Sequence, residues 1–272
     1  MASQVPATSP ADTLSAAGLV HPLERLSMLL GAQHARVSLT RVGGRAIEVS
    51  PSHILVAGIE RRVQLGSAVE IDTGGGYAIG EVIGVQARSV TIKLYSNSQR
   101  LGLGDRVWIR PDISIRPTSS WRGRVVNALG EPIDQRGPLA QGPSAHVVDR
   151  DPIPPMKLSR VHRSIETGVR AIDLFTPICA GQRIGIFAGS GVGKSTLVSM
   201  LSRSRGFKTI VVALVAERGR EVREFIEDVL GPRLDRAVVV VASSAESAMM
   251  RRLAAKTAMT VAEHFRDSGE DV

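Results

Sequence analysis

The chain has 272 residues, which is enough for one large domain or two domains of ordinary size. Apolar residues make up 43% and charged residues 22%, a composition typical of a packed globular core, and no apolar stretch is long enough to span a membrane. The net charge of +8 is divided equally between residues 1–150 and 151–272, and aromatic residues make up only 3%. Because there is no basic block and little to stack on bases, we expect no nucleic-acid partner.

The first 34 residues predict a disordered tail and a short helix. Residues 1–20 are rich in Ala, Ser, Thr and Pro and lack a basic segment before an apolar core, so they do not form a secretory signal. Residues 21–33 carry leucines at helical spacing, namely Leu23, Leu26, Leu29 and Leu30. The exposed face of this helix leaves two alternatives open: contact with an assembly partner or a membrane surface, or packing on its own domain.

Residues 35–112 show the two-residue period of short strands. The expected strands cover residues 37–39, 46–49, 53–56, 68–71, 78–85, 90–94 and 106–109. Glycine-rich turns separate several of them, as at residues 74–76 and 102–105. This spacing predicts a small β-barrel or sandwich. The segment contains no cluster of metal ligands or nucleophiles, so we interpret it as an assembly domain.

Residues 113–272 predict an α/β domain. A Pro- and Ser-rich linker at 111–120, strand-like pieces within 121–143 and an extended proline-rich segment at 149–155 lead into it. Strands are then expected at 184–187, 209–215 and 237–242, with the last two buried on both faces of a parallel sheet. Helices are expected at 196–205, at 221–230, and from a capping box at Ser243–Glu246 to about Arg266, and the second is stopped by Gly231. Gly206 is the expected stop of the first, and residues 270–272 suggest the start of a further strand.

The strand expected at 184–187 leads into a glycine-rich loop, and a helical pattern follows at once. This is the context in which a P-loop binds nucleotide phosphates. The candidate ATP-binding residues are Gly189, Ser190, Gly191, Val192, Gly193, Lys194, Ser195 and Thr196. Glycines let successive backbone N–H groups face phosphate oxygens, Lys194 supplies a point charge, and the Ser195 hydroxyl is a candidate Mg²⁺ ligand. The pattern departs from its strict form at Ala188, where a glycine is usual.

A second candidate element follows the strand expected at 209–215. Glu217 and Arg218 would lie at its carboxyl end, the edge of an open α/β sheet at which ligands bind. A carboxylate there can orient or deprotonate the water that attacks a γ-phosphate. Arg218 could stabilise phosphate charge or pair with Glu217. The alternative is a surface ion-pair cluster within residues 217–221, and spacing alone does not separate the two.

Cys179 is the single cysteine. An intrachain disulfide is therefore impossible, and a reducing compartment fits. Because its neighbours are apolar, we expect an inert core position rather than a nucleophile.

Four segments in order resemble the catalytic-subunit family of rotary ATP synthases. They are residues 122–134, residues 166–173, the glycine-rich loop and residues 216–221. The amino-acid sequence of the loop and of residues 217–222 is most similar to that of the flagellar export ATPase and the type III secretion ATPases. The resemblance runs from about residue 35 to the end of the chain.

This resemblance implies a β-barrel that forms a ring, a RecA-like nucleotide-binding domain and a C-terminal helical domain. It implies a cytoplasmic homohexamer at the inner face of the bacterial membrane, with ATP and Mg²⁺ at subunit interfaces. The implied partners are stalk and regulator proteins of the export apparatus, export substrates and their chaperones. In the family, the glutamate that matches Glu217 is the catalytic carboxylate, and the residues that match Lys194 and Ser195 bind phosphate and Mg²⁺.

The sequence departs from the family in one large way. The Mg²⁺-positioning aspartate of the family would lie on a strand that begins near Asp271, and the adenine-contacting aromatic and the trans-acting arginine come later still. We therefore expect a sheet truncated before it is complete. The alternatives are a virulence secretion ATPase, a rotary ATPase subunit, a non-catalytic nucleotide-binding fragment and, least favoured, a hexameric RNA helicase.

Overall fold

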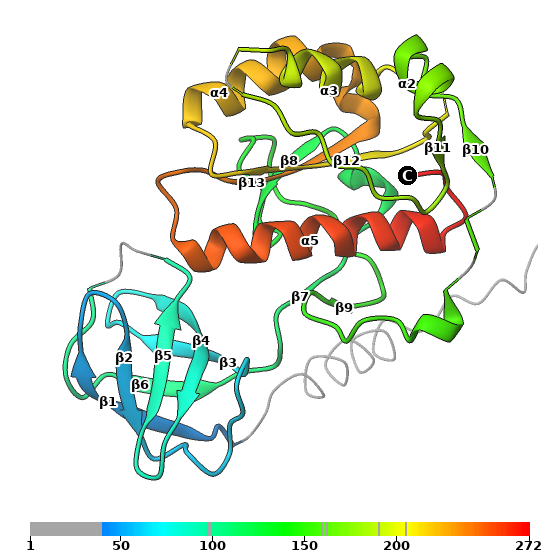
Figure 1. Cartoon of the computed structure of the whole chain (residues 1–272). Helices are drawn as coiled ribbons and strands as arrows, with labels where there is room; N and C mark the ends of the chain where they lie inside the picture. The colour runs from blue at the N-terminus through cyan, green and yellow to red at the C-terminus, as the bar shows by residue number, and fades with distance from the viewer. Residues whose placement is uncertain (1–39, 97–99, 159, 162, 190, 205) are drawn as a thin grey trace, which may run out of the picture. The chain divides into compact units, whose positions relative to one another are not determined.

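The computed structural model describes residues 40–96, 100–158, 160, 161, 163–189, 191–204 and 206–272. The predicted fold class is confirmed, because a closed β-barrel is followed by an α/β domain with a parallel sheet (Figure 1). The tail and helix predicted for residues 1–34, and the strand predicted at 37–39, lie outside the described residues. The domain boundary at residue 112 stays a prediction.

Six antiparallel strands form the barrel, in the order β1-β2-β5-β4-β3-β6. Their bounds are β1 Gly43–Val49, β2 Ile54–Ala57, β3 Ala68–Asp72, β4 Tyr77–Val85, β5 Val90–Leu94 and β6 Arg106–Ile109. β6 pairs with both β3 and β1, so the barrel closes and no strand has a free edge. Each of the six strands predicted from residue 46 onward is present within about three residues of its expected bounds.

Alternate side chains of the barrel strands point inward and fill its core. Val56, Val69, Ile71, Val90 and Val107 are each fully buried, in agreement with the two-residue period. Gly80 lies where β4 crosses closely over β5, because a Cβ there would come within 2.7 Å of Ile92 Cγ2. The absence of a side chain at this position therefore allows the two strands to approach each other.

Three parallel strands form the sheet of the α/β domain, in the order β12-β13-β8. They are β8 Arg124–Asn127, β12 Ile210–Val215 and β13 Ala237–Ala242. Every residue of the central strand β13 is buried, as predicted. β12 is the outer strand and is only half-buried, so the prediction that both its faces are buried is wrong. Its outer edge has no strand beside it among the described residues, which leaves its side chains partly open to solvent.

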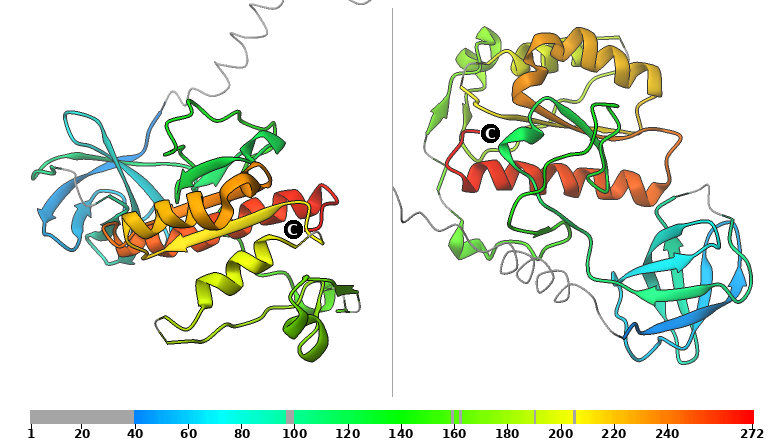
Figure 2. Two further views of the ribbon diagram at one scale, coloured as in Figure 1. Left: turned by 90° about the horizontal axis from the view of Figure 1, so that it is seen from above. Right: turned by 180° about the vertical axis from the view of Figure 1, so that it is seen from behind.

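Helices cover both faces of this sheet (Figure 2). α5 (Ala248–Asp267) packs on one face, against a core that includes Val238, Val240 and Phe265. α4 (Gly219–Glu224) continues into the π-helical turn η3 (Phe225–Leu230) and then η4 (Gly231–Arg236). The second core, on the other face, joins α4 and η3 to the sheet.

Shorter elements connect these layers. β7 (Ser114–Ile115) pairs with β9 (His146–Val147), and β10 (Ser164–Ile165) pairs with β11 (Ile178–Cys179). η1 (Ser119–Trp121), η2 (Pro155–Lys157), α2 (Arg170–Phe175) and α3 (Lys194–Ser202) complete the described elements. The predicted linker at 111–120 therefore contains structure of its own, and Ile115 within it is buried. Cys179 is half-buried on β11, so it is not the core position that its neighbours suggested.

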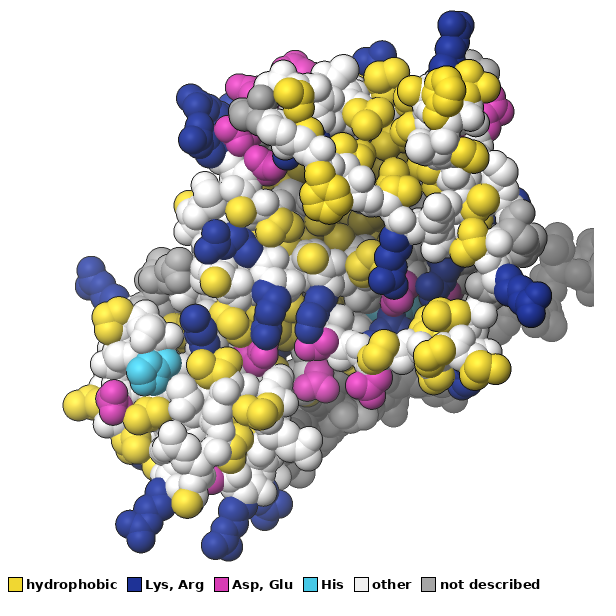
Figure 3. Space-filling model, in the orientation of Figure 1, with side chains coloured by type: hydrophobic (Ala, Val, Ile, Leu, Met, Phe, Trp, Pro, Cys, Tyr) yellow, Lys and Arg dark blue, Asp and Glu magenta, His cyan; other side chains and the backbone are white. Residues whose placement is uncertain are grey.

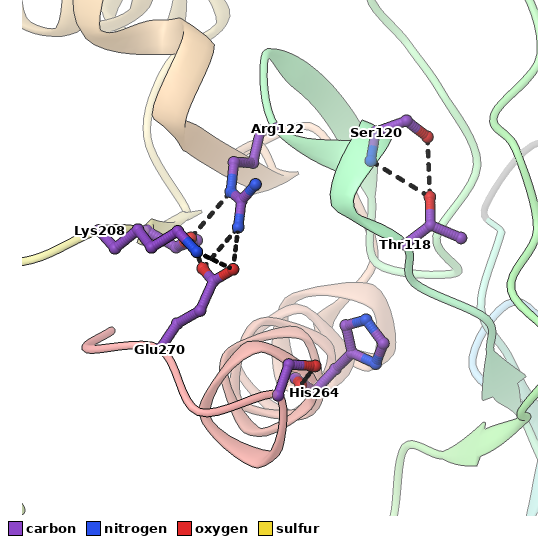
Figure 4. A network of polar contacts seen from close by, with 8 residues as sticks. Thr118, Ser120, Arg122, Lys208, His264 and Glu270 are labelled. Atoms are coloured by element: carbon purple, nitrogen blue, oxygen red, sulfur yellow. Dashed lines mark hydrogen bonds and ion pairs between the residues drawn. The ribbon is translucent and has the colours of Figure 1, made fainter.

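A polar network joins the start of the sheet to the end of α5 (Figure 4). Glu270 accepts hydrogen bonds from the Arg122 guanidinium and from Thr209 Oγ1, and Lys208 Nζ lies 3.1 Å from its carboxylate. Arg122 also lies over the Phe265 ring, 4.8 Å from its centroid. Burial raises the pKa of Glu270, but these hydrogen bonds outweigh it, and the pKa falls to about 2. The network fastens the segments before β8 and β12 to the segment after α5, where no strand forms at 270–272.

The strand predicted at 184–187 is wrong, because this segment has no regular secondary structure. Ile184 is 48% exposed and Phe187 is 97% exposed. A strand needs a neighbour to satisfy its backbone groups. Within the described part of the chain, none lies beside this segment.

Two helix ends also differ from prediction. The N-cap of α5 is Ser247, whose Oγ accepts a hydrogen bond from the Met250 N–H at 3.0 Å, whereas Ser243–Glu246 forms a turn before it. α3 ends at Ser202, four residues before the predicted glycine stop. Arg236 donates to the carbonyl oxygens of Ser202 and Ser204, at 2.8 and 2.9 Å, and so satisfies this helix end from a distant part of the sequence.

Within the described residues, no helix combines the length and apolar character needed to cross a membrane.

Candidate functional site

The glycine-rich loop has the backbone geometry of an anion-binding turn. Gly191 and Gly193 have φ angles of 77° and 96°, in the left-handed region that glycine adopts without strain. Gly193 is the N-cap residue of α3, and Lys194 is the first residue of the helix. Ser190, another predicted phosphate-binding residue, lies outside the described residues. Residues 191–193 thus lead directly into a helix, as the motif predicts.

The N-terminus of α3 is open toward solvent. No side chain caps its first amides, and residues 191–196 are all exposed. Such a helix end presents unpaired N–H groups and a positive dipole end to an anion. Lys194, at the same end, makes no hydrogen bond or ion pair with another described residue. A phosphate group placed there would meet backbone donors and a cation without displacing an internal partner.

Ser195 is the predicted Mg²⁺ ligand, and its hydroxyl is exposed on the first turn of α3. No group of three or more His, Cys, Asp or Glu side chains in the described part of the chain could hold a metal ion by itself. A single hydroxyl fits Mg²⁺ only as one of several oxygen ligands, with phosphate oxygens and water supplying others. The residues present therefore fit an ion that arrives with the nucleotide rather than a resident metal.

The loop does not lie at the end of a sheet strand as the sequence predicted. Because residues 184–187 are not paired, α2 and α3 lie beyond the open side of β12 (Figure 2). Glu217 follows the carboxyl end of β12, as expected. Within the described residues, no hydrogen bond or ion pair joins Glu217 to Lys194 or to the rest of the loop. The structure thus brings the loop residues together but does not join them to Glu217.

The backbone beside Glu217 is strained. Ala216 has a φ angle of 64°, which is uncommon for a residue with a Cβ. Its N–H donates to the Ala242 carbonyl at 2.8 Å, and the Ser244 N–H donates to the Glu217 carbonyl at 2.9 Å. The end of β13 therefore holds this turn in place while the Glu217 side chain projects into solvent. Strain of this kind is often found at functional sites.

Arg218 pairs with Glu221 rather than with Glu217. The Arg218 guanidinium lies 3.7 Å from the Glu221 carboxylate, which also accepts the Arg218 N–H at 3.3 Å. This backbone hydrogen bond is the main cause that lowers the pKa of Glu221, and the positive charges of Arg218 and Arg220 add to it. The start of α4 is thus an exposed cluster of two arginines and two carboxylates.

Sequence reasoning missed several residues that hold these segments. Asp173 accepts hydrogen bonds from the N–H and hydroxyl of Thr167, at 2.9 and 2.7 Å, and so fixes the turn before α2. Both residues belong to one of the four recognised segments, so their pairing could have been proposed. The contact of Arg236, at the end of η4, with the end of α3 could not have been proposed, because 34 residues separate Arg236 from its partner Ser202.

Comparison with known proteins relates these features to one family. Residues 168–272 match the family model described as the ATP synthase alpha/beta family, nucleotide-binding domain. The flagellum-specific ATP synthase of Rhizobium meliloti (strain 1021) is 49% identical over 230 residues, covering 85% of this chain and 49% of the relative. Residues 168–272 are therefore similar to the nucleotide-binding domain of the ATP synthase alpha/beta family. The chain also resembles the N-terminal portion of the flagellar and type III export ATPases.

Other relatives agree on this branch. The flagellum-specific ATP synthase of Bacillus subtilis (strain 168) is 42% identical and covers 71% of this chain and 44% of the relative. Among solved structures, the assembled ATPase EscN with its central stalk EscO, from the type III secretion system of enteropathogenic E. coli, has a TM-score of 0.76 and 32% identity. That match covers 84% of this chain and 56% of EscN. The chain therefore spans about half the length of the curated relatives it matches.

Proposed function

We propose that this chain supplies the barrel and the phosphate-binding loop of a hexameric ATPase that energises flagellar, type III protein export. The observation that carries the proposal is the loop that leads into the uncapped N-terminus of α3, with Gly191 and Gly193 in left-handed conformations and Lys194 unpaired. The similarity of residues 168–272 to the nucleotide-binding domain of the ATP synthase alpha/beta family supports a nucleotide as the ligand.

Each site residue has a proposed role. Backbone N–H groups of residues 189–196 surround the phosphates, Lys194 neutralises the β- and γ-phosphates, and the Ser195 hydroxyl ligates Mg²⁺. Glu217 positions or deprotonates the attacking water, and Arg218 stabilises phosphate charge after it leaves Glu221. For this arrangement to act, residues 184–187 must pair with a neighbouring strand so that the loop approaches the carboxyl end of β12.

The partners proposed for the assembled enzyme follow from its relatives. They are further copies of the chain in a hexamer, a central stalk and a regulator, and export substrates with their chaperones, at the inner face of the bacterial membrane. The structure of EscN with its stalk supports the stalk assignment by similarity.

A chimera tests this function directly. The chain would replace the matching part of the R. meliloti flagellum-specific ATP synthase, which supplies the remaining half. We expect ATP turnover by the chimera, and loss of both binding and turnover with Lys194→Ala. Glu217→Gln should retain ATP binding while turnover falls about a hundredfold, the scale of a positioned acid–base group.

The control for Glu217 is Glu227→Gln, which removes an exposed carboxylate that pairs with Arg223 on the same surface. Equal effects of the two substitutions would show that Glu217 has no catalytic role. Restoration of flagellar export by the chimera favours the flagellar assignment over the virulence or rotary branches. If nucleotide binds but neither chain nor chimera turns over, the non-catalytic fragment is the better description.

A further inference from the structure

A large pocket lies between the barrel and the N-terminal end of α5, away from the glycine-rich loop. We call it the seam pocket. Its volume is about 820 Å³, and the polar side chains that line it include those of Ser50, His53, Lys93, Arg100, Glu246 and Arg251. None belongs to residues 184–218, so the site is independent of the proposed nucleotide site. Lys and Arg side chains gather along this seam in Figure 3.

The seam pocket concentrates positive charge without matching acceptors. Lys93, Arg100 and Arg251 line it, whereas Glu246 is the single acidic residue of its lining. Within the described residues, none of the three cations has an ion pair or a hydrogen bond from its charged group. Neighbouring basic residues differ: Arg252, one position later on α5, binds Glu81 of the barrel, and Lys256 binds Asp149.

Arg251 has an unsatisfied hydrogen-bond donor at the seam pocket. Its Nε atom is buried and has no hydrogen-bond partner within the described part of the chain. A buried polar group without a partner is costly, and more so when the group is charged. A ligand in the pocket would be bound by the terminal nitrogens of the same guanidinium, whose planar shape is suited to two-point recognition of an oxyanion.

Neutral donors complete the lining. Ser247 and Ala248 begin the 20-residue helix α5, whose positive dipole end therefore faces the pocket. On the barrel side, the Ser50 hydroxyl lies 3.0 Å from His53 Nδ1. The same hydroxyl donates to the His53 carbonyl oxygen at 2.8 Å, and the Ser52 hydroxyl also lies 3.0 Å from Nδ1. The pocket thus combines cations, a helix N-terminus and side-chain hydroxyl groups.

We propose that the seam pocket binds a small phosphate-bearing anion. Its volume lies within the range of small-molecule sites, about 300–1,000 Å³. Three cations against one carboxylate favour a ligand with more than one negative charge, such as a pyrophosphate group. The ligand would bridge Lys93 of the barrel and Arg251 of α5, and so would fasten the two elements together. Free pyrophosphate and a nucleoside diphosphate such as ADP both carry this pyrophosphate group.

Isothermal titration calorimetry on the full chain tests the proposal, with pyrophosphate as the probe and ADP in parallel. The background is Lys194→Ala, which silences the glycine-rich loop, so failure of this site and failure of the proposed function are distinguishable. We expect one pyrophosphate to bind per chain. Lys93→Gln and Arg251→Gln should each weaken binding by about tenfold, because each removes a charge-assisted contact.

The matched control is Arg88→Gln, which removes an exposed barrel charge outside the pocket. Glu246→Gln should strengthen binding, an opposite sign that general loss of fold cannot produce. Arg100→Gln, at an exposed position, keeps the test available if Arg251→Gln does not fold. Comparison of pyrophosphate with ADP distinguishes a free anion from a nucleotide.

Three results would overturn the site. One is the absence of pyrophosphate binding in the Lys194→Ala background. Another is equal weakening by Arg88→Gln and Lys93→Gln, which would indicate a general effect of net charge. The third is tighter binding of an acidic peptide than of pyrophosphate, which would assign the pocket to a protein partner.

Discussion

The barrel and the glycine-rich loop segment show two opposite ways in which a sequence pattern becomes structure. In the barrel, every strand has two neighbours, and its alternating apolar side chains are buried. In the segment 184–187, an equally apolar pattern stays unpaired, and Phe187 is almost fully exposed. The barrel closes on residues within 70 positions of one another, whereas the loop segment depends on a neighbouring strand that the described chain does not provide. Hydrophobic pattern therefore predicts structure where the pairing partners are also present.

The largest expected effect concerns the charge in the loop. Lys194→Ala should lower the affinity of the chain for ADP by on the order of a hundredfold, because the phosphates lose the cation of the loop. Barrel stability should not change, since Lys194 contacts no barrel residue. Titration with ADP and thermal unfolding measure the two properties. Unchanged ADP affinity would remove the glycine-rich loop from the proposed site.

Core truncation should separate the two regions next. Val107→Ala in the barrel, where the side chain is fully buried, should destabilise the fold by about 1–3 kcal/mol. Phe187→Ala removes a larger side chain, but its effect should stay below about 0.5 kcal/mol because the ring is exposed. Urea unfolding measures both. Equal destabilisation by the two would show that residues 184–187 pack in solution.

Glycine substitutions sharpen the same contrast. Gly80→Ala should destabilise the barrel by about 1–3 kcal/mol, since its Cβ would lie 2.7 Å from Ile92 Cγ2. Gly193→Ala has open space around its Cβ but a φ of 96°, so it should mainly weaken ADP binding by distorting the loop. A result in which Gly193→Ala destabilises the fold more than Gly80→Ala would contradict this account.

The smallest effect is a pH dependence at Glu270, which lies outside both regions. Its pKa is about 2 in the folded chain and near 4.5 when exposed, so its stabilising contribution is complete above about pH 4.5. That contribution is lost as the pH falls from 4.5 towards 2. Glu270→Gln should flatten the pH dependence of stability in this window.

The sequence predicted those parts of the molecule whose signals are local. The six barrel strands, the buried strand β13 and the helix α5 each follow from a short period and adjacent turn residues. The predicted start of α5 at Ser243–Glu246 is wrong because the spacing of these two residues matches a capping box, whereas Ser247 lies nearer the helix and takes the N-cap position. The pairing of β8 with β13 joins residues more than 100 positions apart and has no local signal.

The candidate site divides in the same way. The predicted loop residues 189–196 are contiguous, so a local motif proposes them together, and the φ angles of Gly191 and Gly193 agree with that motif. Glu217 was placed correctly after β12, but its relation to the loop depends on strand pairing that local pattern cannot establish. The seam pocket was not predicted, because Lys93 and Arg251 come from separate elements and match no motif.

Hydrogen exchange of the backbone amides, with and without ADP, tests the central claim most directly. We predict that amides of the six barrel strands, which lie between residues 43 and 109, exchange slowly in both conditions, because each strand is hydrogen-bonded to two neighbouring strands. Amides of residues 191–197 should exchange rapidly in the free chain and become protected when ADP binds. If ADP leaves residues 191–197 unchanged, or if the barrel exchanges as rapidly as the loop in the free chain, the account is wrong.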